Sequence, residues 1–160
     1  YRQSTGEDLY RRSLYTFWKR TRPAPAMITF DSSTRETHIV APTRTNTPLQ
    51  ALNLMNDVTY TEAARALAQG VMQQGLNVDD NLTTMYRMAT AREPQARVHT
   101  VLAGAFDEHL QEYRSDRASA LQLVSEGESE RDETLDIVEL AAYQMVASLI
   151  LNLDGTITRD

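Results

Sequence analysis

The sequence contains no cysteine, which excludes disulfides, thiolate-bound zinc, iron–sulfur clusters and a cysteine nucleophile from this chain. Only six of its 160 residues are glycine, and it has no glycine-rich phosphate loop, nucleophile elbow, CxxCH or HExxH motif. The longest apolar run, at residues 140–151, is interrupted by Gln144 and Ser148 and falls well short of the roughly 20 residues that cross a bilayer. We therefore expect no transmembrane segment and no enzymatic activity from this chain alone.

Composition and length predict a folded, single helical domain over residues 1–160, because 41% of residues are hydrophobic and 24% are charged. The net charge of −6 is unevenly distributed. Residues 1–50 contain eight Lys or Arg and four acids, giving +4, whereas residues 107–139 contain three Arg and eleven acids, giving −8. We favour attraction between these two regions over a basic binding face.

Helical spacing of apolar residues, punctuated by capping residues and prolines, recurs along most of the chain. The first such pattern, at residues 7–20, ends at the prolines of TRPAP, and residues 26–46 show no helical period. Further helices are predicted to begin at Pro48, after Asn56 and Asp57, after Asp79 and Asp80, at Pro94, at Ser115 or Asp116, and after Asp136. The acidic segment at residues 127–134 is predicted to be a solvated loop. The predicted fold is all-α, an irregular bundle of about six or seven helices with one extended irregular insert.

The segment TRTNTPLQALNLMND, residues 43–57, contains the candidate binding residues. On a helix that starts at Pro48, the polar side chains form a narrow stripe and the apolar side chains a wide arc, which predicts a largely buried helix. The favoured interpretation is that the buried amides bond to the backbone of the irregular insert. The alternative is a cleft for a polyhydroxylated or anionic ligand, with Trp18 as a stacking platform. The candidate ligand-binding residues are Arg44, Asn46, Gln50, Asn53, Asp57 and Trp18.

Metal and nucleic-acid sites are weakly indicated. His99 and His109 are ten residues apart, about 80° around a helix, so they cannot chelate one ion together, and His38 is interpreted as an ordinary histidine. Residues 10–22 interleave aromatic and basic side chains in a pattern that can bind polyanions. The aromatic positions also have the periodicity of a core helix, so we favour a structural role and expect no metal and no nucleic acid.

Four segments resemble the planctomycete-specific C-terminal domain family, a family of unknown function that often accompanies cytochrome-c-like domains in large bacterial proteins. They are RRSLYTFWKRT at residues 11–21, FDSSTRETH at 30–38, RTNTPLQALNLMND at 44–57 and VASLILNLD at 146–154. The chain departs from this pattern at His38, where a cysteine is common, and at Gly155. The resemblance implies no catalytic residues.

The resemblance implies that the chain is the C-terminal part of a larger, exported protein, located in the periplasm or secreted. It also implies that any haem belongs to a separate domain of that protein, and that this chain has no cofactor of its own. We therefore expect a non-catalytic helical interaction or scaffold module, whose partner is the N-terminal part of the same protein or another protein. The alternative function is glycan binding or processing, with a polysaccharide bound in a polar cleft around residues 44–57.

Overall fold

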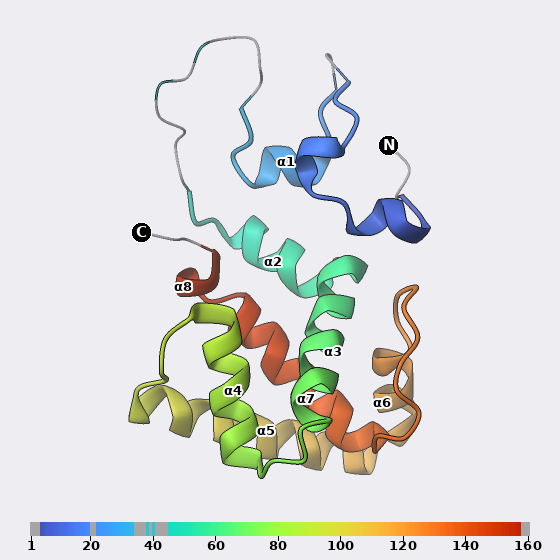
Figure 1. Ribbon diagram of the computed structural model, residues 1–160, viewed down its shortest axis with the longest axis vertical. Coiled ribbons are helices and arrows are strands. Elements are labelled where there is room, and N and C mark those ends of the chain that lie inside the picture. The colour runs from blue at the N-terminus through green and yellow to red at the C-terminus, as the bar shows by residue number, and fades with distance from the viewer. Residues whose placement is uncertain (1–3, 20–21, 34–37, 39, 41–44, 158–160) are drawn as a thin grey trace. The chain divides into compact units, whose positions relative to one another are not determined.

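The computed structural model describes residues 4–19, 22–33, 38, 40 and 45–157, and in these residues it contains α-helices, two 3₁₀ turns and no strand. The prediction of an all-α fold is confirmed (Figure 1). The chain divides into two compact units, residues 1–53 (unit 1) and residues 54–160 (unit 2). The helices are α1 (Pro25–Thr29), α2 (Pro48–Asn56), α3 (Val58–Met72), α4 (Val78–Thr90), α5 (Ala96–Ser115), α6 (Arg117–Val124), α7 (Ile137–Leu151) and α8 (Asp154–Ile157).

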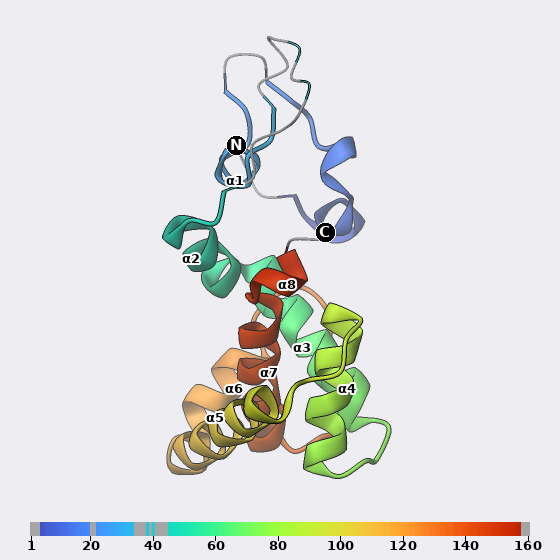
Figure 2. The same ribbon diagram turned by 90° about the vertical axis from the view of Figure 1, so that its left-hand side faces the viewer.

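Unit 2 is built around α7, which packs against α3, α4, α5 and α6 (Figures 1 and 2). Most residues of α7 are buried, from Val138 to Ile150, and its apolar residues extend around the helix. A helix that is apolar on all sides is expected at the centre of a domain rather than at its surface. On the partner helices, the buried residues follow one stripe each, as the sequence predicts; those of α3 and α4 include Ala64, Ala68, Val71, Leu82 and Met85.

Side-chain caps fix where several helices begin. Asp57, Asp116 and Asp136 each accept a hydrogen bond from a backbone N–H in the first turn of the following helix, as the sequence predicts. The predicted cap of α4 is wrong by two residues, because Asn77 takes that role by accepting from the N–H of Asp80 at 2.9 Å. Asp79 and Asp80 lie in the first turn of α4, where the positive end of the helix dipole stabilises negative charge.

Unit 1 does not contain the α-helix that the sequence predicts over residues 7–20. Two short 3₁₀ turns, η1 (Gly6–Tyr10) and η2 (Ser13–Tyr15), occupy this segment instead. The apolar side chains have the right spacing, but Leu14 and Phe17 are 75% and 73% exposed, so they gain little from packing. A helix of this length is marginal in water without tertiary contacts, which explains why the pattern alone does not specify it.

The structure places a short helix, α1, in a segment that the sequence predicts to be interrupted by proline. Pro25 is the first helical residue of α1, a position where the missing N–H is not needed. The helix ends before Asp31, whose φ of 56° turns the chain. The predicted irregular insert at residues 26–46 therefore begins with one helical turn, and most of its remainder lies outside the described residues.

The helix α2 begins at Pro48, as predicted, but the prediction that it is largely buried is wrong. Leu49, Leu52 and Met55 are 60%, 58% and 45% exposed, and the buried residue of this helix is Gln50. The face of α2 that carries Gln50 is buried, and not the face that carries the leucines, because the Gln50 amide forms hydrogen bonds there. The apolar stripe at positions i, i+3 and i+6 faces solvent.

Among the helices in the described ranges, none is both long and apolar enough to cross a bilayer.

Candidate functional site

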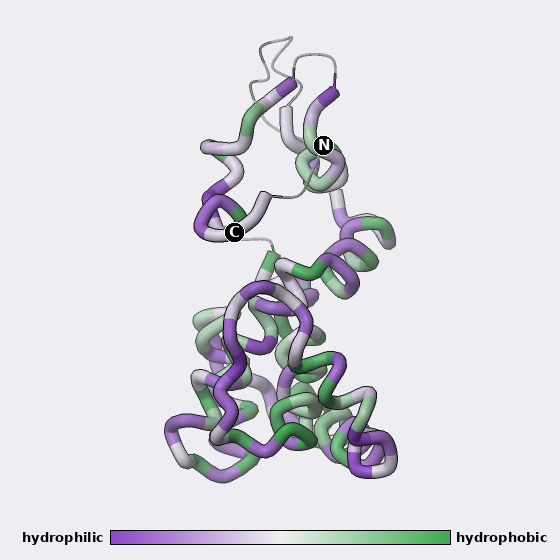
Figure 3. Tube along the Cα trace, turned by 90° about the vertical axis from the view of Figure 1, so that its right-hand side faces the viewer, coloured by the Kyte–Doolittle hydropathy of each residue, from purple (hydrophilic) through white to green (hydrophobic). Residues whose placement is uncertain are grey.

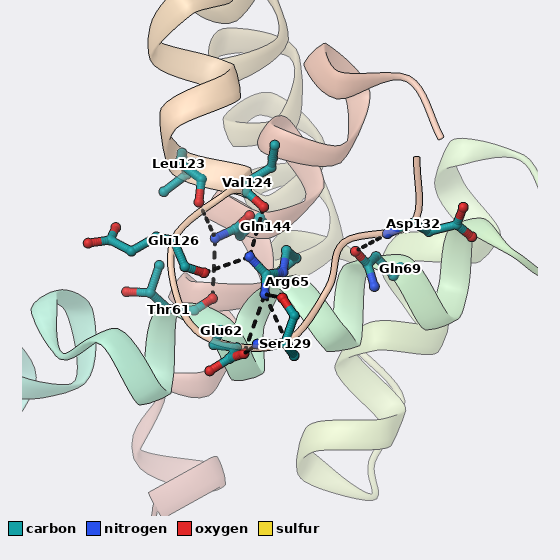
Figure 4. Close-up of polar contacts among 10 residues, drawn as sticks. All are labelled: Thr61, Glu62, Arg65, Gln69, Leu123, Val124, Glu126, Ser129, Asp132 and Gln144. Carbon is teal, nitrogen blue, oxygen red and sulfur yellow. Dashed lines mark hydrogen bonds and ion pairs between the residues drawn. The ribbon is translucent and has the colours of Figure 1, made fainter. Parts of the chain in front are cut away.

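The polar centre of unit 2 is the guanidinium of Arg65 on α3, which is 1% exposed (Figure 4). Its Nη1 donates to the carbonyl oxygens of Val124 at 2.7 Å and Glu126 at 2.6 Å. Its Nη2 donates to the carbonyl oxygen of Ser129 at 2.6 Å and to the Ser129 hydroxyl at 2.8 Å. A cation at the last carbonyls of α6 is favoured by the helix dipole, so Arg65 both ends α6 and holds the loop that follows it.

Glu62, one helical turn before Arg65, completes this centre. Its Oε1 lies 3.4 Å from Arg65 Nη2 and also accepts a hydrogen bond from the Ser129 N–H. The loop reaches the carboxylate because Gly127 has a φ of +101°, and a Cβ at this position would lie 2.7 Å from the Glu62 Cδ. Only glycine combines that backbone conformation with that close approach.

The sequence predicts that the acidic loop at residues 127–134 is solvated. The structure shows that this loop also forms hydrogen bonds to α3. Several of its side chains are exposed, but its backbone is tied to α3 at two places. Besides the Ser129 contacts, the Asp132 N–H donates to Gln69 Oε1 at 3.1 Å, and Asp132 Oδ2 accepts from Gln73 Nε2 at 2.8 Å. Hydrogen bonds from the Thr134 hydroxyl, Gln73 and the Thr134 N–H lower the pKa of Asp132.

Unit 1 uses Gln50, one of the predicted site residues, to hold the insert. Gln50 Oε1 accepts from the Thr47 N–H at 2.9 Å, and Nε2 donates to the Thr29 carbonyl at 2.8 Å and to the Thr45 hydroxyl at 3.2 Å. Asp31 joins this cluster because its Oδ2 accepts from both the N–H and the hydroxyl of Thr45 at 2.7 Å. These bonds from Thr45 lower the pKa of Asp31. The predicted contact between a buried amide and the insert is thus present at Gln50.

The other predicted binding residues have separate environments. Asp57 Oδ1 accepts from the Thr59 N–H at 2.9 Å and so caps α3. Asn46 is exposed, whereas Trp18 and Asn53 are half-buried. Arg44 lies outside the described residues. Gln50 bonds to the start of α2 and Asp57 caps α3, and glycan binding at residues 44–57 stays a prediction.

Residues 10–19 of unit 1, which we call the aromatic segment, form the most exposed group of large apolar side chains. Tyr10, Leu14, Tyr15 and Phe17 are between 53% and 75% exposed. In Figure 3 the part of the chain before α1 is mostly hydrophilic or neutral, with short hydrophobic stretches among the hydrophilic ones. A hollow of about 380 Å³ lies in residues 4–19. It is lined by Tyr15 and Phe17 together with Asp8, Arg11, Lys19, Ser4 and Thr16. Within this lining, Arg11 and Asp8 form an exposed ion pair at 2.8 Å.

The described residues contain no group of three or more His, Asp or Glu side chains able to hold a metal ion. His99 and His109 lie near single carboxylates instead. His99 Nε2 is 3.7 Å from Asp79 Oδ1, and His109 Nδ1 is 3.3 Å from Glu112 Oε2. These pairs are partly exposed and consist of one histidine and one acid each.

Sequence reasoning missed Arg65 and Glu62. The available signal was an acid and an arginine three residues apart in a predicted helix, a spacing that is also typical of exposed ion pairs on a helix surface. Gln144 could also have been identified from the sequence, because it is a polar residue within the apolar run of α7. Its Nε2 donates to the carbonyls of Thr61 at 3.2 Å and Leu123 at 3.5 Å, which ties α7 to α3 and α6 (Figure 4).

Comparison with known families places residues 1–105 in PSD1, a family described as a protein of unknown function (DUF1553). The chain belongs to this family. The predicted membership of a family of unknown function is thus confirmed, although the segment at residues 146–154 lies beyond the matched range. No curated protein and no solved structure matches the chain. Planctomycete specificity, export and association with cytochrome-c-like domains stay predictions from the resemblance.

The matched range of the family ends inside α5. Arg65 and Glu62 belong to this range, whereas their partners in the α6–α7 loop follow it. The polar centre of unit 2 therefore joins the family region to the C-terminal helices.

Proposed function

We propose that the chain is a non-catalytic helical module that binds a protein partner through the aromatic segment, and that the partner presents an apolar and acidic surface. The observation that carries this proposal is the exposure of four large apolar side chains within eight residues of unit 1. Soluble chains rarely leave such groups in water unless the surface is used for association.

The charge of the segment supports an acidic partner. Residues 1–50 carry a net charge of +4, and Arg11 and Lys19 lie beside Tyr15 and Phe17 in the hollow of unit 1. Aromatic and arginine side chains are the groups most often found at the energetic centre of protein interfaces. A partner with carboxylates around an apolar centre would match both features.

The turns that carry these residues support binding over a purely internal role. Neither η1 nor η2 contains a buried residue, and no side-chain hydrogen bond caps either turn. A segment with this little packing gains stability when a partner covers its apolar groups. If this segment were a core helix, its apolar stripe would be buried against the rest of the protein.

Selection of displayed 12-residue peptides on the immobilised chain tests the proposal. We expect the selected peptides to combine Asp or Glu with Leu, Phe or Trp. The double variant Leu14→Ser, Phe17→Ser should bind these peptides about tenfold or more weakly, since removal of apolar contacts at an interface centre costs at least this much.

The matched control is Val101→Ser on α5, because Val101 is 64% exposed and lies outside the aromatic segment. This variant should bind the selected peptides as the unmodified chain does. Peptides that bind the Leu14, Phe17 double variant with unchanged affinity, or a selection that enriches no acidic peptides, would contradict the proposal.

A further inference from the structure

Unit 2 contains a cavity of about 290 Å³ at the C-terminal end of α2, bounded by α3, α6 and α7. We propose that this cavity is a binding site for an alkylammonium group. The proposal concerns a different unit from the aromatic segment and does not depend on the function proposed there.

The deepest polar group of the cavity wall is Gln144, which is 1% exposed. Its amide orientation is set by two carbonyl acceptors, because Nε2 donates to Thr61 and Leu123. Oε1 must therefore be the acceptor end of the amide, and it is buried without a hydrogen-bond partner in the described part of the chain. Gln144 belongs to the cavity lining, and an unpaired acceptor on a lining residue favours a ligand that donates a hydrogen bond.

The remaining polar groups of the wall also favour a donor. Glu126 contributes a carboxylate, and the Thr61 hydroxyl already donates to the Asp57 carbonyl at 3.2 Å, which leaves its oxygen free to accept. Ser148 adds a hydroxyl and Asn56 an amide, groups that can accept as well as donate, and none of the described lining residues is basic. An ammonium group supplies three donors and the charge that complements a carboxylate.

The buried guanidinium of Arg65 does not oppose the binding of a cationic ligand. The guanidinium of Arg65 points its donors at the carbonyls of the α6–α7 loop and lies 3.4 Å from Glu62 (Figure 4). Its charge is thus compensated by a carboxylate of its own. Figure 4 shows the Glu126 side chain directed away from Arg65, and Glu126 is one of the residues that line the cavity.

The apolar part of the wall sets the shape of the ligand. Met55, Leu123 and Met145 line the cavity beside Ala64, and methionine side chains adapt to narrow aliphatic groups. The volume lies just below the usual range for ligand pockets, and it accommodates an unbranched chain of about four carbons. This chemistry is shared by a free alkylamine and by the side chain of a lysine residue.

The test is an NMR titration of the ¹⁵N-labelled 160-residue chain with n-butylammonium chloride, n-butanol and sodium butyrate. We expect saturable shifts with n-butylammonium at the backbone amides of Thr61, Gln144 and Ser148 and at the Gln144 side-chain amide. Butanol should bind more weakly and butyrate should cause no saturable shift. Equal binding of butanol or butyrate, or no saturable shift with n-butylammonium, would overturn the proposal.

A second titration with N-acetyl-lysine methylamide distinguishes the two sources. Binding of this blocked lysine at the same residues assigns the site to a lysine side chain, and binding of the free amine alone assigns it to a small amine. Either result supports an ammonium site.

Glu126→Gln should weaken n-butylammonium binding about two- to fivefold, as expected for loss of a partly exposed charge pair. Glu130→Gln is the matched control, since it makes the same charge change in the α6–α7 loop at a residue outside the cavity lining. Both replaced residues are exposed and Gln144 is unchanged, so the chain should stay folded and the site can be measured. Equal weakening by the two variants would show a general charge effect and overturn the assignment.

Discussion

Replacement of Arg65 by methionine should destabilise unit 2 more than any surface change. Arg65 donates to three carbonyl oxygens and one hydroxyl at 2.6 to 2.8 Å, and Glu62, 3% exposed, depends on it for charge compensation. Loss of one partner of such a buried pair costs about 3–5 kcal/mol. For a cooperative unit of about one hundred residues, this free energy corresponds to a fall in Tm of roughly 12–20 °C.

Thermal and urea unfolding followed by far-UV circular dichroism would measure this loss. The control Arg87→Met should change the free energy of unfolding by less than about 1 kcal/mol, because Arg87 and its partner Glu93 are both exposed. Adding Glu62→Gln to Arg65→Met should recover part of the loss, since it removes the uncompensated charge. An Arg65→Met chain as stable as the unmodified one would refute the role given to this residue.

Three further predictions concern single positions. Gly127→Ala should lower the unfolding free energy by more than about 1 kcal/mol in urea titrations, since the new Cβ would meet Glu62 at a φ of +101°. Gln50→Ala should accelerate amide hydrogen exchange in the first turn of α2, and unchanged exchange would argue against the contacts of its side chain. The Ser119 hydroxyl and N–H lower the pKa of Asp116, so this carboxylate stabilises the fold above its ordinary pKa of 3.8 and the effect is lost as pH falls through the folded value. In a carboxyl ¹³C titration, Ser119→Ala should raise that pKa.

Much of unit 2 is predictable from sequence because local signals and tertiary packing agree there. Asp57, Asp116 and Asp136 precede apolar stripes at helical spacing, and the structure uses each as a cap. The binary pattern fixes which face of each helix is buried once the helices pack on α7. In this unit, capping and periodicity located most of the helices, although the cap of α4 is Asn77 and not the predicted acids.

In unit 1, helical periodicity did not predict which side chains are buried. The periodicity of residues 7–20 is that of a core helix, but periodicity does not state whether a second surface exists to cover it, and Leu14 and Phe17 are exposed. For α2, the count of apolar residues favoured burial of the leucines, whereas the hydrogen bonds of Gln50 turned the opposite face inward. Both outcomes depend on partners distant in sequence.

Of the polar contacts in the candidate site, one was predicted from the sequence and one was not. The contact of an amide with the insert followed from the need to satisfy buried polar groups, and Gln50 makes it. The Arg65 centre could not be located because its acceptors are carbonyl oxygens at residues 124, 126 and 129. Backbone carbonyls carry no sequence signature, so such a partner becomes visible only in the fold.

The most direct test of the interaction module is the temperature dependence of its binding enthalpy. Isothermal titration of a selected acidic peptide into the unmodified chain at several temperatures should give a clearly negative ΔCp, because binding buries apolar surface. The Leu14→Ser, Phe17→Ser double variant should give a smaller ΔCp magnitude and weaker binding, and Val101→Ser should match the unmodified chain. A ΔCp near zero, or one that the double variant leaves unchanged, would contradict the assignment of the aromatic segment as the docking surface.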